Sequence, residues 1–142
     1  MKIYLDTSSL IKLYFFEQGT EELDKLFRKN QINEIFLSEI SKIEFSYAIW
    51  KKIRTRELDK EDALELIDGF NSDYAKYTFI EVTHEIIEKS AELILKYGSK
   101  GLRTLDSIHL ASIIKVKEEI EIGKSADKLL EEFFNNERIK YE

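Results

Sequence analysis

Acidic residues stand at several positions where α/β proteins place their functional groups. Asp6 comes directly after the apolar run of residues 3–5, which predicts a short strand that ends at this carboxylate. Ligand clefts of open α/β sheets lie at the carboxyl ends of the strands, so Asp6 is a candidate member of such a cleft. Capping of the following helix explains an isolated Asp at this position equally well.

Two further acids fall on apolar stripes of predicted helices. One stripe holds Ile40, Ile43, Glu44, Tyr47 and Ala48. The other holds Leu102, Leu105, Asp106, His109, Leu110 and Ile113. A carboxylate on an inward-facing stripe is costly unless it is paired or holds a metal ion. A salt bridge would also explain Glu44, and the helix dipole would explain Asp106 in a first turn. His109 is most simply a core residue, and we assign it no catalytic role.

Asp127 completes the set at the start of the last predicted helix, where it could equally be ordinary helix-start chemistry. In a parallel sheet Asp6, Glu44, Asp106 and Asp127 can all meet in one crevice. Clustered carboxylates repel one another and are tolerated mainly around hard cations such as Mg²⁺ or Mn²⁺. A centre of this kind can hydrolyse a phosphodiester. No glycine-rich phosphate loop or Ser–His–Asp order competes with it.

Strands alternate with helices along the chain. The sequence patterns predict strands at residues 2–5, 35–37, 77–82 and 119–122, and an edge strand is one interpretation of residues 138–141. Helices are predicted at residues 10–16, 21–29, 39–56, 60–74, 84–97, 104–117 and 126–134. This order predicts an α/β fold with a mainly parallel sheet. No linker or repeat divides residues 1–142, so we expect a single domain.

Composition narrows the class of protein. The 142 residues, 43% hydrophobic and 35% charged, suit one globular core. The absence of cysteine excludes disulfides and thiolate metal sites. No apolar stretch approaches the ~20 residues that cross a membrane, and no signal-peptide pattern opens the chain, so we expect a cytoplasmic protein. The net charge of −6 opposes indiscriminate binding to nucleic acid, but it allows a nuclease whose acids surround cations.

Four segments resemble the motifs of PIN-domain nucleases, above all the VapC-type toxins of toxin–antitoxin pairs. They are residues 3–14, 38–44, 102–111 and 125–130, in the order and at the spacing of that family. The first and third are the more specific. One departure concerns the fourth motif, which usually follows directly on a strong apolar strand. Here Gly123 and Lys124 intervene after a weak one, which makes the place of Asp127 less secure.

The resemblance implies a parallel sheet of about five strands flanked by helices. It also implies Mg²⁺ or Mn²⁺ bound by Asp6, Glu44, Asp106 and Asp127, endonucleolytic cleavage of RNA, a homodimer, and a partner antitoxin that covers the site. Hydroxyl groups near the metal or phosphate would come from Thr7, Ser8 and Ser125.

Alternatives remain open at this level. An inactive PIN-like module that acts only by association with protein or RNA would carry the same pattern. A phosphatase or phospho-receiver fits less well, since Ser8 stands where the haloacid-type signature needs an Asp. Basic residues that could guide RNA along the rim are Lys51, Lys52, Arg54 and Arg103. Aromatic and apolar residues that could line a partner surface are Tyr14, Phe15, Phe16, Phe45, Ile49 and Trp50.

Overall fold

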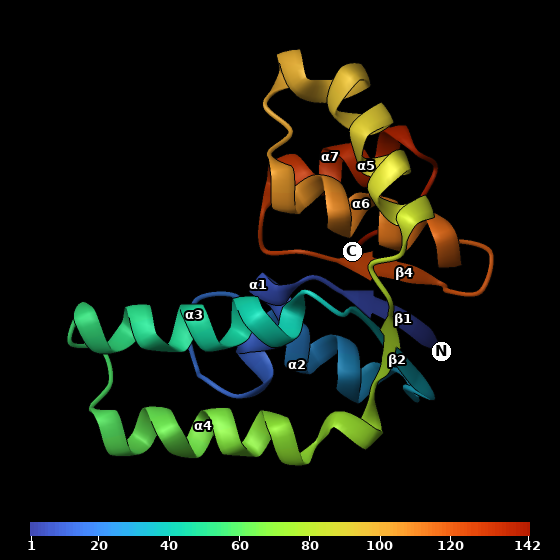
Figure 1. Ribbon diagram of the computed structural model, residues 1–142. Helices are drawn as coiled ribbons and strands as arrows, with labels where there is room; N and C mark the ends of the chain where they lie inside the picture. Colours follow the sequence, from blue (N-terminus) through green and yellow to red (C-terminus); the bar gives the residue numbers. More distant parts are fainter.

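A four-stranded parallel sheet forms the centre of the protein in this computed structural model, which describes all 142 residues (Figure 1). The strand order is β3-β2-β1-β4. The strands are β1 (Lys2–Leu5), β2 (Glu34–Ser38), β3 (Thr78–Ile80) and β4 (Ile122–Lys124). The predicted parallel α/β fold is therefore confirmed, but with four strands instead of about five. The segment expected as a fifth strand contributes only one parallel bridge, between Tyr141 and Gly123.

Helices cover both faces of this sheet, α1 to α4 on one face and α5 to α7 on the other (Figure 1). The α-helices are α1 (Thr7–Leu10), α2 (Thr20–Lys29), α3 (Ser41–Arg54), α4 (Lys60–Ser72), α5 (His84–Tyr97), α6 (Thr104–Val116) and α7 (Lys128–Asn136). Short 3₁₀ turns follow α1, α4 and α5, as η1 (Ile11–Leu13), η2 (Tyr74–Lys76) and η3 (Gly98–Lys100).

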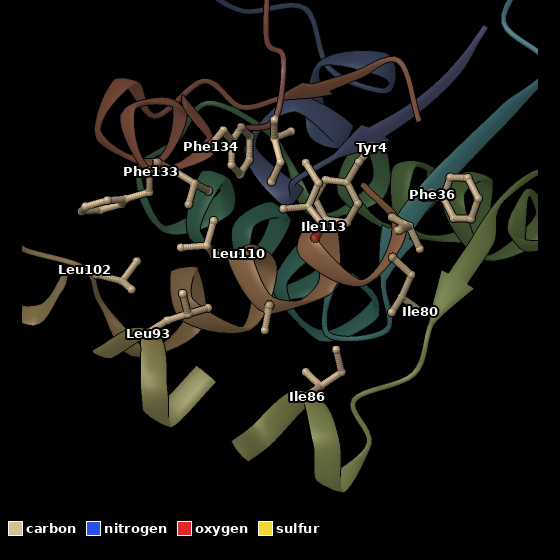
Figure 2. Close-up of a cluster of buried hydrophobic side chains, with 14 of the residues drawn as sticks. Tyr4, Phe36, Ile80, Ile86, Leu93, Leu102, Leu110, Ile113, Phe133 and Phe134 are labelled. Carbon is tan, nitrogen blue, oxygen red and sulfur yellow. The ribbon is translucent and has the colours of Figure 1, made fainter. Parts of the chain in front are cut away.

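The pleat of the strands divides the core into two layers, because successive strand residues point to opposite faces. Ile3 and Leu5 of β1 join a buried cluster with the residues of α1 to α4. Tyr4, between them, joins the cluster on the other face. Tyr4 and Phe36 belong there to one cluster with side chains of α6 and α7, among them Ile113 and Phe134 (Figure 2). Sheet strands buried on both sides are typical of parallel α/β proteins.

The predicted inward stripe of α3 is wrong by part of a turn. Ile43 and Tyr47 are 73% and 61% exposed, whereas Phe45 and Ile49 are completely buried. This helix carries apolar residues all round its circumference, so its sequence offers more than one plausible inner face. Packing against the sheet selected the face that holds Ser41, Phe45 and Ile49. These two apolar residues therefore cannot line a partner surface as predicted.

The β4 strand begins three residues and ends two residues later than predicted. Its register pairs Ile122 with Ile3 and Gly123 with Tyr4, so Gly123 and Lys124 belong to the strand itself. The charged residues before Ile122 and the glycine after it conceal this strand in the sequence, because glycine is unfavourable in strand interiors. The fourth motif thus follows directly on a strand, and the apparent departure from the family pattern disappears. None of the helices contains an apolar stretch that could span a lipid bilayer.

Candidate active site

A cleft of about 320 Å³ opens at the carboxyl ends of the strands and brings together all four predicted acids. Its lining consists of Asp6, Thr7, Ser8, Glu44, Arg103, Asp106, His109, Ala126 and Asp127. A larger hollow of about 440 Å³ near the C-terminus contains a single acid, Glu142, whereas the cleft brings four acids together. Nearly all of its lining is polar or charged, which suits a charged ligand and not an apolar one.

The sheet positions each acid by the same device, a strand or loop that delivers it to one edge. The amide of Asp6 donates to the carbonyl of Lys124 at 3.1 Å, so β1 and β4 end side by side. Asp6 caps α1, and Asp127 caps α7 directly beyond β4. Glu44 lies in the first turn of α3, and Asp106 in the first turn of α6. Asp6, Glu44 and Asp127 follow β1, β2 and β4, whose carboxyl ends lie at the same edge of the sheet. Asp106 reaches this edge from α6, which follows α5 and η3.

Asp6 is the most deeply buried acid of the cleft, with only 5% of its surface exposed. Its Oδ1 accepts hydrogen bonds from the Ser8 hydroxyl at 2.7 Å and from the Ser9 amide at 2.9 Å. Its Oδ2 accepts one from the Ser125 hydroxyl at 2.6 Å. None of these partners carries a positive charge. A buried carboxylate supported only by neutral donors is costly and favours a nearby cation.

Glu44 is half-buried and is tied to the opposite side of the cleft. Its Oε1 accepts a hydrogen bond from Thr7 Oγ1 at 2.8 Å and lies 2.6 Å from His109 Nε2. Burial alone would raise the pKa of Glu44, but the bonds from His109 and Thr7 outweigh it, and the pKa lies below its usual range. Glu44 is therefore ionised at neutral pH.

Arg103 spans the mouth of the cleft between the two remaining acids. Its Nε lies 3.2 Å from Asp106 Oδ2, and its Nη2 lies 3.6 Å from Asp127 Oδ2. Burial, together with the charge of Asp127, raises the pKa of Asp106, although Arg103 opposes this rise. The second oxygen of Asp127 is occupied as well, since Oδ1 accepts from the amides of Leu129 and Leu130. Asp127 thus faces the cleft but also serves as a helix cap.

The donor set of the cleft fits a hard divalent cation. It offers carboxylate and hydroxyl oxygens, which Mg²⁺ and Mn²⁺ prefer. Asp6 is buried without a positively charged partner, and the charge of Asp127 adds to burial in raising the pKa of Asp106, so a bound cation would stabilise the ionised form of both acids. The side chains are not closed into a ready ligand shell: no three His, Cys, Asp or Glu residues are grouped to hold an ion. Arg103 occupies the acids that such a shell would need.

The other basic residues that we predicted at the rim have different roles. Lys52 is largely buried, paired with Glu17 at 3.0 Å and stacked over the ring of Phe15. Arg54 lies over the exposed ring of Tyr47. Lys51 lines a second hollow that shares Ser8 with the acidic cleft. Of the four, only Arg103 lies in the cleft itself.

His109, for which the sequence predicted only a place in the core, lines the cleft and contacts one of its acids. The sequence did contain a signal, because His109 is three residues after Asp106 and shares its helix face. Leu105, which was placed on the same inward stripe, is instead 48% exposed. Asp106 and His109 therefore face the cleft, whereas Leu110 and Ile113 are buried in the core.

Fold and cleft together define a class: a parallel α/β domain with an acidic, oxygen-rich pocket at the carboxyl edge of its sheet. A model of the PIN domain family matches residues 3–121. The chain belongs to the PIN domain family. No curated protein matches its sequence significantly.

Solved structures of toxin–antitoxin proteins share the fold. VapC20 from Mycobacterium tuberculosis, a Sarcin-Ricin loop cleaving toxin, has a TM-score of 0.68 at 15% identity, covering 92% of this chain and 93% of that one. VapBC2 from Rickettsia felis, bound to a DNA fragment from its promoter, has a TM-score of 0.66 at 20% identity, covering 100% and 98%. A toxin–antitoxin complex from Klebsiella pneumoniae has a TM-score of 0.61 at 17% identity, covering 89% and 87%.

Proposed function

We propose that this protein is a metal-dependent endoribonuclease and the toxin of a toxin–antitoxin pair. The observation that carries the proposal is the meeting of Asp6, Glu44, Asp106 and Asp127 in one cleft of a PIN-family fold. Structural neighbours that are themselves toxins or toxin–antitoxin complexes support the biological role.

In this proposal the cleft acids hold Mg²⁺ or Mn²⁺, with Asp6, Asp106 and Glu44 as the principal ligands and Asp127 as a further one. The bound cation would activate a water molecule and stabilise the charge that develops on the phosphodiester. Ser8 and Ser125 orient Asp6 through their hydroxyl donors, and Thr7 does the same for Glu44. Arg103 would leave its two acids when the cation binds and would then be free to pair with a phosphate oxygen.

RNA is the substrate that suits this cleft best. The pocket is open and polar, and single-stranded or looped RNA can bend its backbone into a narrow opening. VapC20, which shares the fold, is described as cleaving the Sarcin-Ricin loop, which supports an RNA target here too.

We also propose two protein partners. The toxin–antitoxin complexes among the structural neighbours support a cognate antitoxin. In this proposal the antitoxin covers the acidic cleft. A homodimer would cover the apolar side chains that α3 leaves exposed, Ile43, Tyr47 and Trp50.

The decisive experiment compares RNA cleavage by the wild type with cleavage by Asp6→Asn and Asp106→Asn in the presence of Mg²⁺ or Mn²⁺. Each substitution removes a charged metal ligand, so we expect the rate of RNA cleavage to fall by at least ~100-fold. Loss of a residue that only orients a ligand typically costs about 10–100-fold. Asp68→Asn on α4 is the matched control, because this exposed acid lies outside the cleft. It should cleave at the wild-type rate.

The same variants separate the nuclease from an inactive binding module. Calorimetric titration with Mn²⁺ should show binding by the wild type and by Asp68→Asn, and weak or no binding by Asp6→Asn. Equal cleavage by all four proteins, or no binding of Mn²⁺ by the wild type, would contradict the proposed function.

A further inference from the structure

His109 is a buried, titratable side chain that the proposed mechanism leaves without a task. Only 3% of its side chain is exposed, yet it lies against the cleft. Its two ring nitrogens contact different layers of the molecule. Nε2 lies 2.6 Å from Glu44 Oε1 on α3, and Nδ1 lies 2.6 Å from the hydroxyl of Tyr4 on β1.

We propose that His109 is a positioning residue, which fixes the Glu44 carboxylate for cation binding through a chain of hydrogen bonds anchored at Tyr4. This inference rests on the proposed function, since it assigns Glu44 to a metal site. It adds a residue outside the acidic set, and it explains how a side chain from α6 controls a ligand on α3.

The direction of the hydrogen bond follows from the chemistry of the acceptor. An ionised carboxylate can only accept, so Nε2 must carry the hydrogen and donate it to Glu44. This holds for the neutral ring and for the charged ring alike. The Tyr4 hydroxyl occupies Nδ1 in both cases, because it can either donate to that nitrogen or accept from it. Tyr4 is itself completely buried in the sheet, so it provides a rigid anchor.

The two oxygens of Glu44 differ in their hydrogen bonds. His109 and Thr7 both bind Oε1, and no protein group bonds to Oε2. Two donors on one oxygen fix the plane of the carboxylate and leave the other oxygen available to a ligand. Supporting bonds of this kind orient metal-binding side chains in many proteins, and their loss typically weakens metal affinity by about 10–100-fold.

A purely structural role predicts a different substitution pattern. If His109 only filled space, a leucine of similar volume would serve as well at this buried position. Every buried side-chain nitrogen and oxygen of the protein has a hydrogen-bond partner, so a lost donor would leave an acceptor without its bond. Removing His109 would leave the Tyr4 hydroxyl without a partner, and Glu44 Oε1 would keep only the hydrogen bond from Thr7.

The test measures Mn²⁺ affinity by calorimetry for the wild type, His109→Leu and His109→Gln. His109→Leu keeps the volume and loses the donor, and we expect its affinity to fall about 10–100-fold. His109→Gln can still place an N–H group near Glu44, so it should recover most of that loss. His84→Leu is the control, because the other histidine of the chain is exposed on α5. It should bind Mn²⁺ as the wild type does.

NMR spectroscopy of the His109 ring provides a second test if His109→Leu does not fold. The ¹⁵N-labelled wild type should show an Nε2–H proton protected from exchange, and Glu44→Gln and Tyr4→Phe should each shift the His109 ring signals. Equal Mn²⁺ affinity of His109→Leu and the wild type, or ring signals insensitive to Glu44→Gln, would overturn the positioning role. Failure of the wild type to bind Mn²⁺ at all would instead refute the proposed function.

Discussion

At the scale of single residues, the cleft combines charges that are separately unfavourable. Burial works against the charged forms of both Glu44 and His109, yet each stabilises the other. The pKa of His109 would fall through burial, but the bond to Glu44 and the charges of Asp6 and Asp106 raise it above its ordinary value of 6.5. Without a bound cation, therefore, the acidic cleft makes the buried imidazole easier to protonate.

The first residue-scale prediction concerns pH and stability in the presence of a chelator. A raised pKa of His109 contributes stability that is present below the unfolded value of 6.5 and is lost as the pH rises through the folded value. The lowered pKa of Glu44 contributes stability above its unfolded value of 4.5, which is lost as the pH falls through its folded value. The pair should stabilise the fold most between these two limits.

Urea denaturation of the wild type and His109→Gln over a pH series measures this effect. The difference in unfolding free energy between them should be largest between the unfolded values of 4.5 and 6.5, and it should shrink as the pH rises through the raised pKa of His109. The ring signals of His109 should titrate above 6.5, and added Mg²⁺ should lower that midpoint because it neutralises the neighbouring acids. A difference that grows with rising pH would show that the assigned direction of the shift is wrong.

At the scale of secondary-structure elements, the position of Asp127 and Ser125 depends on how closely α6 and α7 approach β4. Gly123 allows this approach. A Cβ atom at this position would overlap Ile113 Cδ1 and lie 3.3 Å from the ring of Phe134. Both side chains are completely buried, as Figure 2 illustrates, so neither can move freely aside. Gly123, which makes β4 hard to recognise in the sequence, is thus required by the close packing of α6 and α7 on this strand.

Gly123→Ala should accordingly destabilise the protein by about 1–3 kcal/mol, the usual effect of overpacking a core. Ile113→Val removes the overlapping methyl group and alone should cost about 0.5–1.5 kcal/mol. Urea denaturation of the double variant should show a loss smaller than the sum of the single losses, because the two substitutions relieve one another. Strictly additive losses would mean that Gly123 matters for another reason.

At the scale of the whole molecule, the sheet is covered on both faces, but one helix side remains apolar and exposed. Ile43, Tyr47 and Trp50 follow one another at helical spacing on the outer side of α3. They are adjacent to Glu44, so a partner on this surface would lie beside the cleft. A two-fold axis would pair the patch with itself, as is usual for homodimers.

Light scattering should therefore give the wild type twice the chain mass of 16.8 kDa. The double variant Ile43→Ser/Tyr47→Ser should be a monomer with unchanged helical circular dichroism, because both side chains already lie in solvent. Leu95→Ser on α5 is the control, and it should remain dimeric even though Leu95 is 89% exposed. A monomeric wild type would refute the homodimer, and a dimeric double variant would assign the contact to another surface.

The sequence alone determined the order of strands and helices and the four acids, since both rest on local patterns. Apolar runs, capping residues and turn signals each involve residues that are close together in the sequence. Asp6 can be read as a strand-end acid because Ile3 and Leu5 precede it, and Asp106 as a first-turn acid because its helix begins at Thr104. Motifs spread over nearly the whole chain indicated the family that the PIN domain model confirms.

Tertiary structure alone decided which side chains meet. The inner face of α3 could not be read from a helix that is apolar all round, and β4 was hidden by Gly123 until its register with β1 was known. The link from Tyr4 through His109 to Glu44 joins residues up to 105 positions apart, and no local pattern encodes it. Such contacts arise only when the helices pack on the sheet, because packing fixes which of several plausible faces turns inward.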